Sequence, residues 1–264
     1  MWAETRASGT DLVRLPDHIL TFCLVELKKI RHDPWEMATR LVQPVLWLLL
    51  FGETFTRLPI FPTGNLPYLS YLAPGIIAQS ALFVAIFYGI QLVWERDAGI
   101  LTKILTTPTP RGAIVSGKAF AAALRGLLQA LVVFVLAGIL GVAFRWSVPA
   151  LLGAVALVMV GAAFFACVSM VLAGLAQQRE RLMGIGQAIT FPLFFASNAL
   201  YPTSLMPGWL QAISEFNPLS YEVDGLRGLL VGTPSHLALD FVVLLGCLVG
   251  GVLVAARLLT RLVR

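Results

Sequence analysis

The sequence predicts an all-α polytopic membrane protein with six transmembrane helices and cytoplasmic N- and C-termini. Hydrophobic residues make up 58% of the 264-residue chain and charged residues only 12%, about half the charged share of a soluble domain. The mean hydropathy is +0.84. A water-soluble fold of this length cannot bury so much apolar surface in one core. The composition therefore excludes an ordinary cytosolic enzyme, a disordered chain and a disulfide scaffold.

Six stretches poor in charge are the candidate spans, because about 20 apolar residues cross a bilayer. The first is the weakest, since Glu53 and Arg57 follow its uncharged centre and Pro44 lies near its start. A proline is nevertheless tolerated in a membrane helix. The predicted spans cover residues 37–58, 68–93, 119–143, 148–174, 182–201 and 237–258.

The basic residues set the orientation. With the N-terminus inside, most of the 19 Lys and Arg residues fall in cytoplasmic segments, as the positive-inside rule requires. Only Arg57, Arg145 and Arg227 fall outside, and both termini are basic, so the number of spans is even. The net charge of +5 is thereby assigned to the inner membrane surface, and no nucleic-acid partner is predicted.

Two cytoplasmic segments are expected to be helical. Residues 1–36 form a tail with a basic, amphipathic interface helix, which precedes the transmembrane domain at 37–262. Between the second and third spans, the apolar residues of 100–105 form one face of a short helix, which Pro108 and Pro110 terminate. A helix of this kind suits a groove on a cytoplasmic partner.

No cofactor or metal is predicted on this chain. The run from Gly112 to Lys118 matches the spacing of a phosphate-binding loop, but Ala119 replaces the required Ser or Thr and no strand precedes it. The three cysteines and three histidines are scattered along the sequence, so no ligand spacing for a metal is present.

The segment between the fifth and sixth spans predicts two short helices. Pro207 stands at the start of the first. Asn217 caps the second and Pro218 occupies its first position. On this second helix Glu222, Asp224 and Arg227 are expected on a different face from the apolar residues Val223, Leu226 and Leu230. Both helices are too short to span and are expected to rest at, or dip into, the outer half of the bilayer.

Three stretches of the sequence together resemble the type-2 ABC transporter permeases, the membrane subunits of ATP-driven exporters. The resemblance covers residues 15–262 and is nearest to the bacterial drug and lipo-oligosaccharide export branch, whose members lie in the cytoplasmic (inner) membrane. The stretches are Trp94-Glu95-Arg96-Asp97-x-Gly99-x-Leu101 with Thr107-Pro108-x-x-Arg111, Tyr201-Pro202 through Met206-Pro207-x-Trp209-Leu210, and Asn217-Pro218-Leu219-x-Tyr221 with Asp224-x-x-Arg227.

The resemblance implies a division of labour. A separate ATPase subunit binds Mg-ATP, two permease copies (homodimer or heterodimer) sit above two ATPases, and a drug, lipid or lipid-linked saccharide is exported. The implied ATPase-coupling residues are Glu95, Arg96, Asp97, Gly99, Leu101, Pro108 and Arg111. The implied outer re-entrant helices carry Pro202, Pro207, Trp209, Asn217, Pro218, Tyr221, Asp224 and Arg227.

Polar residues inside the predicted spans are candidates for the pathway or for an interface. Arg125 lies near the inner edge of the third span, where it either snorkels to the surface or makes a polar contact in the pathway. Gln79, Gln129 and Asn198 either bond between helices or contact substrate.

Two other functions remain open on the sequence alone. A gradient-driven secondary transporter usually carries ionisable residues near the midplane or inverted repeats, and neither is evident here. A membrane-embedded enzyme needs a nucleophile and base, or metal ligands, at one leaflet. The acidic clusters Glu95/Asp97 and Glu215/Glu222/Asp224 have no histidine beside them.

Overall fold

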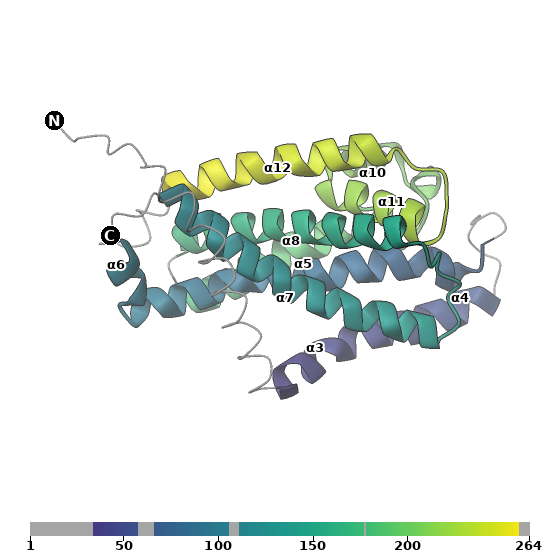
Figure 1. Ribbon diagram of the computed structural model, residues 1–264, viewed down its shortest axis with the longest axis horizontal. Helices are drawn as coiled ribbons and strands as arrows, with labels where there is room; N and C mark the ends of the chain where they lie inside the picture. The colour runs from purple at the N-terminus through teal and green to yellow at the C-terminus, as the bar shows by residue number, and fades with distance from the viewer. Residues whose placement is uncertain (1–33, 58–65, 106–110, 177, 259–264) are drawn as a thin grey trace.

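The computed structural model describes residues 34–57, 66–105, 111–176 and 178–258. Every regular element within these ranges is a helix. Four of the helices are long and apolar enough to cross a membrane, and they lie side by side in one bundle (Figure 1). They are α5 (Tyr68–Asp97), α7 (Arg111–Ile139), α8 (Val148–Ala176) and α12 (Leu237–Leu258).

Helix α5 is the centre of the bundle and packs against α7, α8 and α11. Small residues let α5 and α8 approach closely, as is common between membrane helices. The backbone N–H of Gly89 donates to Ser169 Oγ over 2.8 Å. A Cβ at Gly89 would stand only 2.6 Å from the carbonyl oxygen of Ser169, so the contact requires glycine.

The predicted first span is helical but divided. It comprises α3 (Pro34–Leu46), a π-helical segment (Trp47–Gly52) and α4 (Glu53–Arg57). Its apolar part, Leu41–Thr56, is shorter than the four long helices. Trp47 fixes this segment to the bundle through an edge-on contact with Phe194, whose ring centre lies 5.5 Å away.

The predicted fifth span corresponds to α9 (Arg179–Phe195), which ends before the predicted limit of 201. Helical bonding stops because Ser197 N–H bonds the carbonyl of Phe194 rather than that of Leu193. The chain then turns through 196–200. The sequence gives little warning, because this turn is as apolar as the helix before it.

The remaining boundaries are close to prediction, with one instructive difference. Helices α8 and α12 begin at the predicted positions 148 and 237. Helix α7 begins at Arg111, eight positions before the predicted 119. The run from Gly112 to Lys118 is therefore helical, which removes the loop that phosphate binding would need. The interface helix predicted within 1–36 lies almost entirely outside the described residues.

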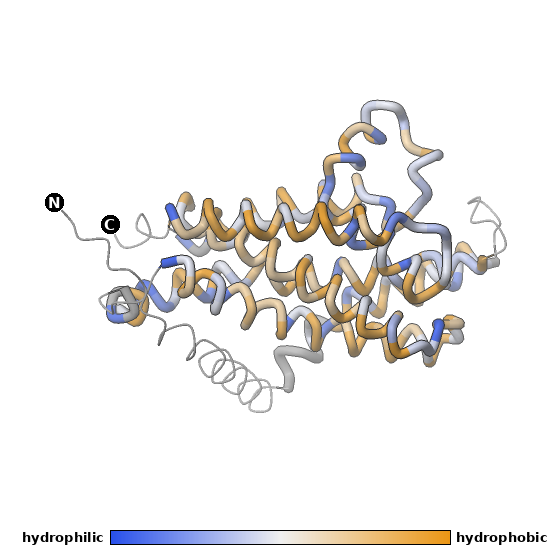
Figure 2. The backbone as a smooth tube through the Cα atoms, turned by 45° about the horizontal axis from the view of Figure 1, so that its top comes forward, coloured by the Kyte–Doolittle hydropathy of each residue, from blue (hydrophilic) through white to orange (hydrophobic). Residues whose placement is uncertain are grey.

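The two ends of the bundle differ. Helix α6 (Ile100–Leu105) lies at one end, and α10 (Gly208–Phe216) and α11 (Pro218–Leu230) lie at the other (Figure 1). We call these the α6 end and the α11 end. The hydropathy along the chain follows this division, with apolar residues dominating the long helices and polar residues concentrated near their ends (Figure 2).

Candidate functional site

At the α6 end, a polar network joins α5 to α7. Lys118 Nζ donates to Glu95 Oε2 in an ion pair. The second oxygen of Glu95 accepts from Gln91 Nε2 over 3.3 Å, and Gln91 Oε1 accepts from Arg125 Nη1 over 2.9 Å. Glu95 and Arg125 are therefore parts of one network, which makes the junction of the two helices stiff.

The turn between α5 and α6 depends on Gly99. Its φ is +70°, a left-handed conformation that favours glycine. Its carbonyl accepts from Lys103 N–H over 3.3 Å, which opens α6. Leu101 is fully buried and anchors the short helix, whereas Ile100 is 49% exposed. The short helix predicted over 100–105 is thus present, with one residue turned inward and one outward.

The other residues predicted for coupling are placed less uniformly. Arg96 and Asp97 pair with each other over 2.9 Å, and the Asp97 side chain is 39% exposed. Arg111 is exposed at the first position of α7. Pro108 lies outside the described residues. The structure therefore gathers Glu95, Arg96, Asp97, Gly99 and Leu101 at one end of the bundle.

At the α11 end, Asn217 caps two helices at once. Its Oδ1 accepts from Leu219 N–H over 3.0 Å, as the predicted N-cap of α11, and Pro218 is the first helical residue. Its Nδ2 donates to the Leu193 carbonyl over 2.6 Å. That carbonyl is the one released where α9 ends. One side chain thus ties α11 to α9.

Arg227 is the second tie at this end. We expected it apart from the apolar face of its helix, but it is only 4% exposed, because it is turned onto Tyr71. Its guanidinium carbon lies 3.8 Å from the centre of the Tyr71 ring. It donates to the carbonyls of Asn198 over 2.8 Å and Tyr71 over 3.3 Å, while Tyr71 Oη donates to the same Asn198 carbonyl over 3.1 Å. Arg227 therefore joins α11 to both α5 and the turn after α9.

The remaining residues predicted for this region lie nearer its surface. Pro202 and Pro207 immediately precede a 3₁₀ turn at Thr203–Leu205 and helix α10 respectively. Tyr221 Oη donates to the Glu215 carbonyl over 2.7 Å. Trp209 is 67% exposed. Both predicted short helices are present, beginning directly after Pro207 and at Pro218.

With the two ends described, comparison with known proteins decides the family. The profile of the family described as "ABC-2 type transporter" matches residues 18–231. This chain belongs to that family. It is the membrane permease subunit of an ABC exporter and not itself an enzyme, and the ATPase that works with it is a separate subunit.

Named relatives of this ABC-2 permease agree. The putative transport permease ycf38 of Porphyra purpurea is 32% identical over 198 residues, which cover 74% of this chain and 67% of the relative. The daunorubicin resistance ABC transporter permease protein DrrB1 of Streptomyces coeruleorubidus is 29% identical over 248 residues, covering 93% and 85%. Nodulation protein J of Rhizobium leguminosarum bv. viciae is 30% identical over 224 residues, covering 84% and 85%.

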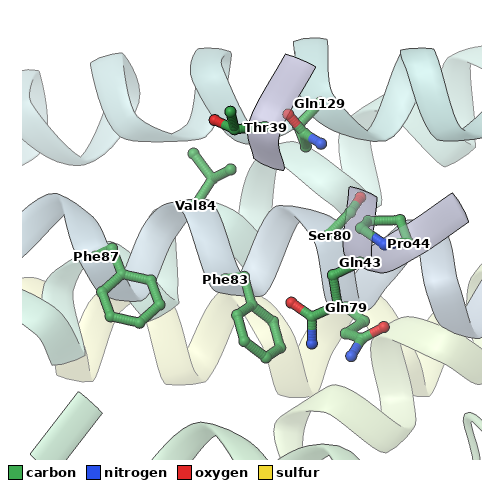
Figure 3. Close-up of a pocket in the computed structure, with 9 residues that line it drawn as sticks. All are labelled: Thr39, Gln43, Pro44, Gln79, Ser80, Phe83, Val84, Phe87 and Gln129. Atoms are coloured by element: carbon green, nitrogen blue, oxygen red, sulfur yellow. The ribbon is translucent and has the colours of Figure 1, made fainter. Parts of the chain in front are cut away.

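Inside the bundle of this ABC-2 permease, two of the polar candidates line the same cavity. Gln79 on α5 and Gln129 on α7 are 1% and 2% exposed and line one cavity together with Gln43 (Figure 3). Arg125 does not line this cavity. Asn198 lies in the turn after α9, where its carbonyl serves Arg227.

The position of Glu222 differs from the one that the sequence predicts. We expected it beside Asp224, apart from the apolar face of α11. Instead it is fully buried against α8, where a Cβ at Gly161 would lie 2.5 Å from its carboxyl carbon. Burial raises the pKa of Glu222 well above its ordinary value of 4.5, which favours the neutral acid. Its spacing from Leu219 and Leu226, three and four positions, places it on the buried face.

Proposed function

We propose that this permease crosses the cytoplasmic (inner) membrane six times, with the α6 end and both termini in the cytoplasm. The four long helices supply four crossings, and Leu41–Thr56 and α9 supply the two shorter ones. The support is the distribution of basic residues together with the position of α6 and α11 at opposite ends of the bundle (Figure 1).

Labelling of single cysteines tests this topology. A cysteine replacing Thr203 at the α11 end should react with a membrane-impermeant maleimide added to intact cells. A cysteine replacing Thr109, which lies between α6 and α7 in the sequence, should react only after the membrane is opened. The reverse pattern would overturn the orientation.

The α6 end is proposed to receive the movement of the ATPase, which binds Mg-ATP. The observation that carries this proposal is the Glu95–Lys118 ion pair, because it fastens α5 to α7 directly above α6. A push on α6 is then passed to two membrane helices together. The half-exposed Asp97 contacts the ATPase. Glu95 does not contact the ATPase but passes the movement of α6 on to α7.

The test is co-purification of the tagged permease with its ATPase in mild detergent, followed by assay of ATP hydrolysis and ATP-driven export. Asp97→Asn should weaken the association, whereas Glu95→Gln should leave association intact and uncouple hydrolysis from export. The control is Glu215→Gln on α10, the same kind of change at the other end of the molecule. If both coupling variants match the control, the assignment of the α6 end is wrong.

Two permease copies are proposed to form the complete transporter, and the cargo is proposed to be amphipathic: a drug, a lipid or a lipid-linked saccharide. Support comes from relatives named for daunorubicin resistance and for nodulation. It also comes from the surface of α9, where Met183, Phe191 and Phe195 are exposed by 48%, 39% and 41%, as befits a helix that meets lipid or a second copy.

A further inference from the structure

The cavity beside Gln79 and Gln129 contains buried polar atoms without partners. Both amide atoms of Gln79 and the amide nitrogen of Gln129 have no hydrogen-bond partner among the described residues. A buried amide left unpaired is costly, and such groups are uncommon in folded proteins. Two of them facing one hollow point to a ligand that completes their bonding.

The two amides lie far from the outer ends of their helices. Gln79 stands 11 positions from the start of α5 and Gln129 stands 10 positions from the end of α7. At about 1.5 Å per residue, each lies roughly 15 Å from the outer end of its helix, which is half the thickness of the hydrocarbon core. Both amides therefore lie near the bilayer midplane.

The cavity has a polar part and an aromatic part. Figure 3 shows the amides of Gln43 and Gln79 close together, Gln129 near Thr39, and the rings of Phe83 and Phe87 following along α5. The described residues that line it carry no charge. Its volume of about 270 Å³ is just below the range of pockets that hold a whole drug-sized molecule, and it suits one ring-sized group.

A second hollow adjoins this cavity. It is an apolar groove of about 370 Å³ that shares Thr39 and Gln43 with the cavity and continues along the π-helical segment past Trp47 and Leu50. Leu50 is 58% exposed, so the groove opens on the membrane side of the first span. The polar cavity matches the polar head of an amphiphile, and the apolar groove matches its tail.

Resting on the proposed function, we propose that this cavity is a substrate site for amphiphiles whose head is uncharged and rich in hydrogen-bonding groups, such as hydroxyls or carbonyls. Gln79 and Gln129 bind the head, the rings of Phe83 and Phe87 cover its apolar face, and the tail lies in the groove. A charged head is disfavoured, because it would be desolvated near the midplane and none of the described residues that line the cavity carries a counter-charge. Arg125 lines the neighbouring hollow and already donates to Gln91.

The probe for this site is a dodecyl glucoside carrying a photoreactive diazirine, used with the permease–ATPase complex in lipid nanodiscs. In Gln79→Leu and Gln129→Leu the half-saturating probe concentration should rise about threefold to tenfold each, the effect of one lost neutral hydrogen bond. The matched control is Gln211→Leu, because Gln211 is an amide on α10 that donates to the Met206 carbonyl and does not line the cavity. Dodecyl phosphate and dodecyltrimethylammonium should compete at least tenfold less well than unlabelled dodecyl glucoside.

Two results would overturn the proposal. One is a half-saturating probe concentration that is the same in both cavity variants as in the control variant. That result would mean that water or bulk lipid fills the cavity. The other is equal competition by the charged amphiphiles. Either result with ATP-driven export intact would remove this site and leave the proposed function standing. If the wild-type permease did not co-purify with an ATPase, the proposed coupling at the α6 end would be overturned, whatever the labelling shows.

Discussion

Arg227 and Asn217 at the α11 end and Gln79 in the central cavity differ in how their buried polar groups are bonded. At the α11 end, Arg227 and Asn217 meet carbonyls that helix ends and turns expose, so the bonding of these groups is completed within the chain. In the cavity, Gln79 has no partner for either amide atom. The contrast teaches that burial of a polar group does not by itself define its role. Arg227 and Asn217 are satisfied within the chain and hold helices together, whereas the unsatisfied amide of Gln79 is proposed to bind a ligand.

The largest expected effect is on Arg227. Arg227→Met keeps the length of the side chain but leaves the Asn198 carbonyl with only Tyr71 and removes the stacked cation. We expect about 3 kcal/mol of destabilisation, because hydrogen bonds to a charged group are worth about 1.5–3 kcal/mol and a buried ring–cation contact adds to them. Thermal unfolding in detergent measures it. Arg227→Lys should recover only part of the loss, and full recovery would mean that charge alone matters.

A smaller loss is expected for Asn217. Asn217→Ala removes the cap of α11 and returns the Leu193 carbonyl to an unpaired state, which should cost about 1–2 kcal/mol. Asn217→Asp keeps the cap but cannot donate to that carbonyl. Its stability should therefore lie between that of wild type and that of Asn217→Ala. Stability of Asn217→Asp equal to that of wild type would remove the tie to α9 from the account.

Glu222 offers a test within the α11 end, because it is buried there with no counter-charge among the described residues, and its neutral form is favoured. Since its pKa is raised on folding, the folded state loses stability relative to the unfolded state as pH rises above 4.5. Glu222→Gln mimics the neutral acid at every pH. The variant should therefore unfold at a higher temperature than wild type at pH 8, and the difference should shrink toward pH 5. A difference that does not vary with pH would contradict this.

The smallest effect is expected in the cavity, and its sign is opposite to that at Arg227. Gln79→Leu removes two unpaired polar atoms at little change in size. Without ligand, the variant should be as stable as wild type or more stable by about 1 kcal/mol. Unfolding curves of the two proteins in ligand-free nanodiscs check this. A clear loss of stability would show that Gln79 is a structural residue like Arg227.

Much of the fold follows from the sequence for identifiable reasons. Uncharged runs locate the long helices, and Asn217-Pro218 marks the start of α11 because cap and first-position preferences are local. The end of α9 at Phe195 does not follow, since it depends on Asn217, which lies 22 positions further along and captures the Leu193 carbonyl. Local patterns cannot report such a contact.

The candidate sites were predictable to different degrees. The residues of the coupling turn are contiguous, so the pattern from Glu95 to Leu101 was visible in the sequence. Gln79 and Gln129 were visible only as polar residues within spans, because their shared cavity depends on how α5 and α7 pack. The pairing of Glu95 with Lys118 also depends on how α5 and α7 pack, so the sequence does not reveal it. A third span that starts at 119 places Lys118 in a loop, whereas α7 includes it.

The measurement that tests the central claim most directly is thermal unfolding of wild type and Gln79→Leu in nanodiscs, each with and without dodecyl glucoside. A ligand that binds only the folded protein raises its unfolding temperature. At a glucoside concentration near the half-saturating value of wild type, we expect the unfolding temperature of wild type to rise several times more than that of Gln79→Leu, although the variant starts at an equal or higher temperature. Equal shifts in both proteins would contradict it.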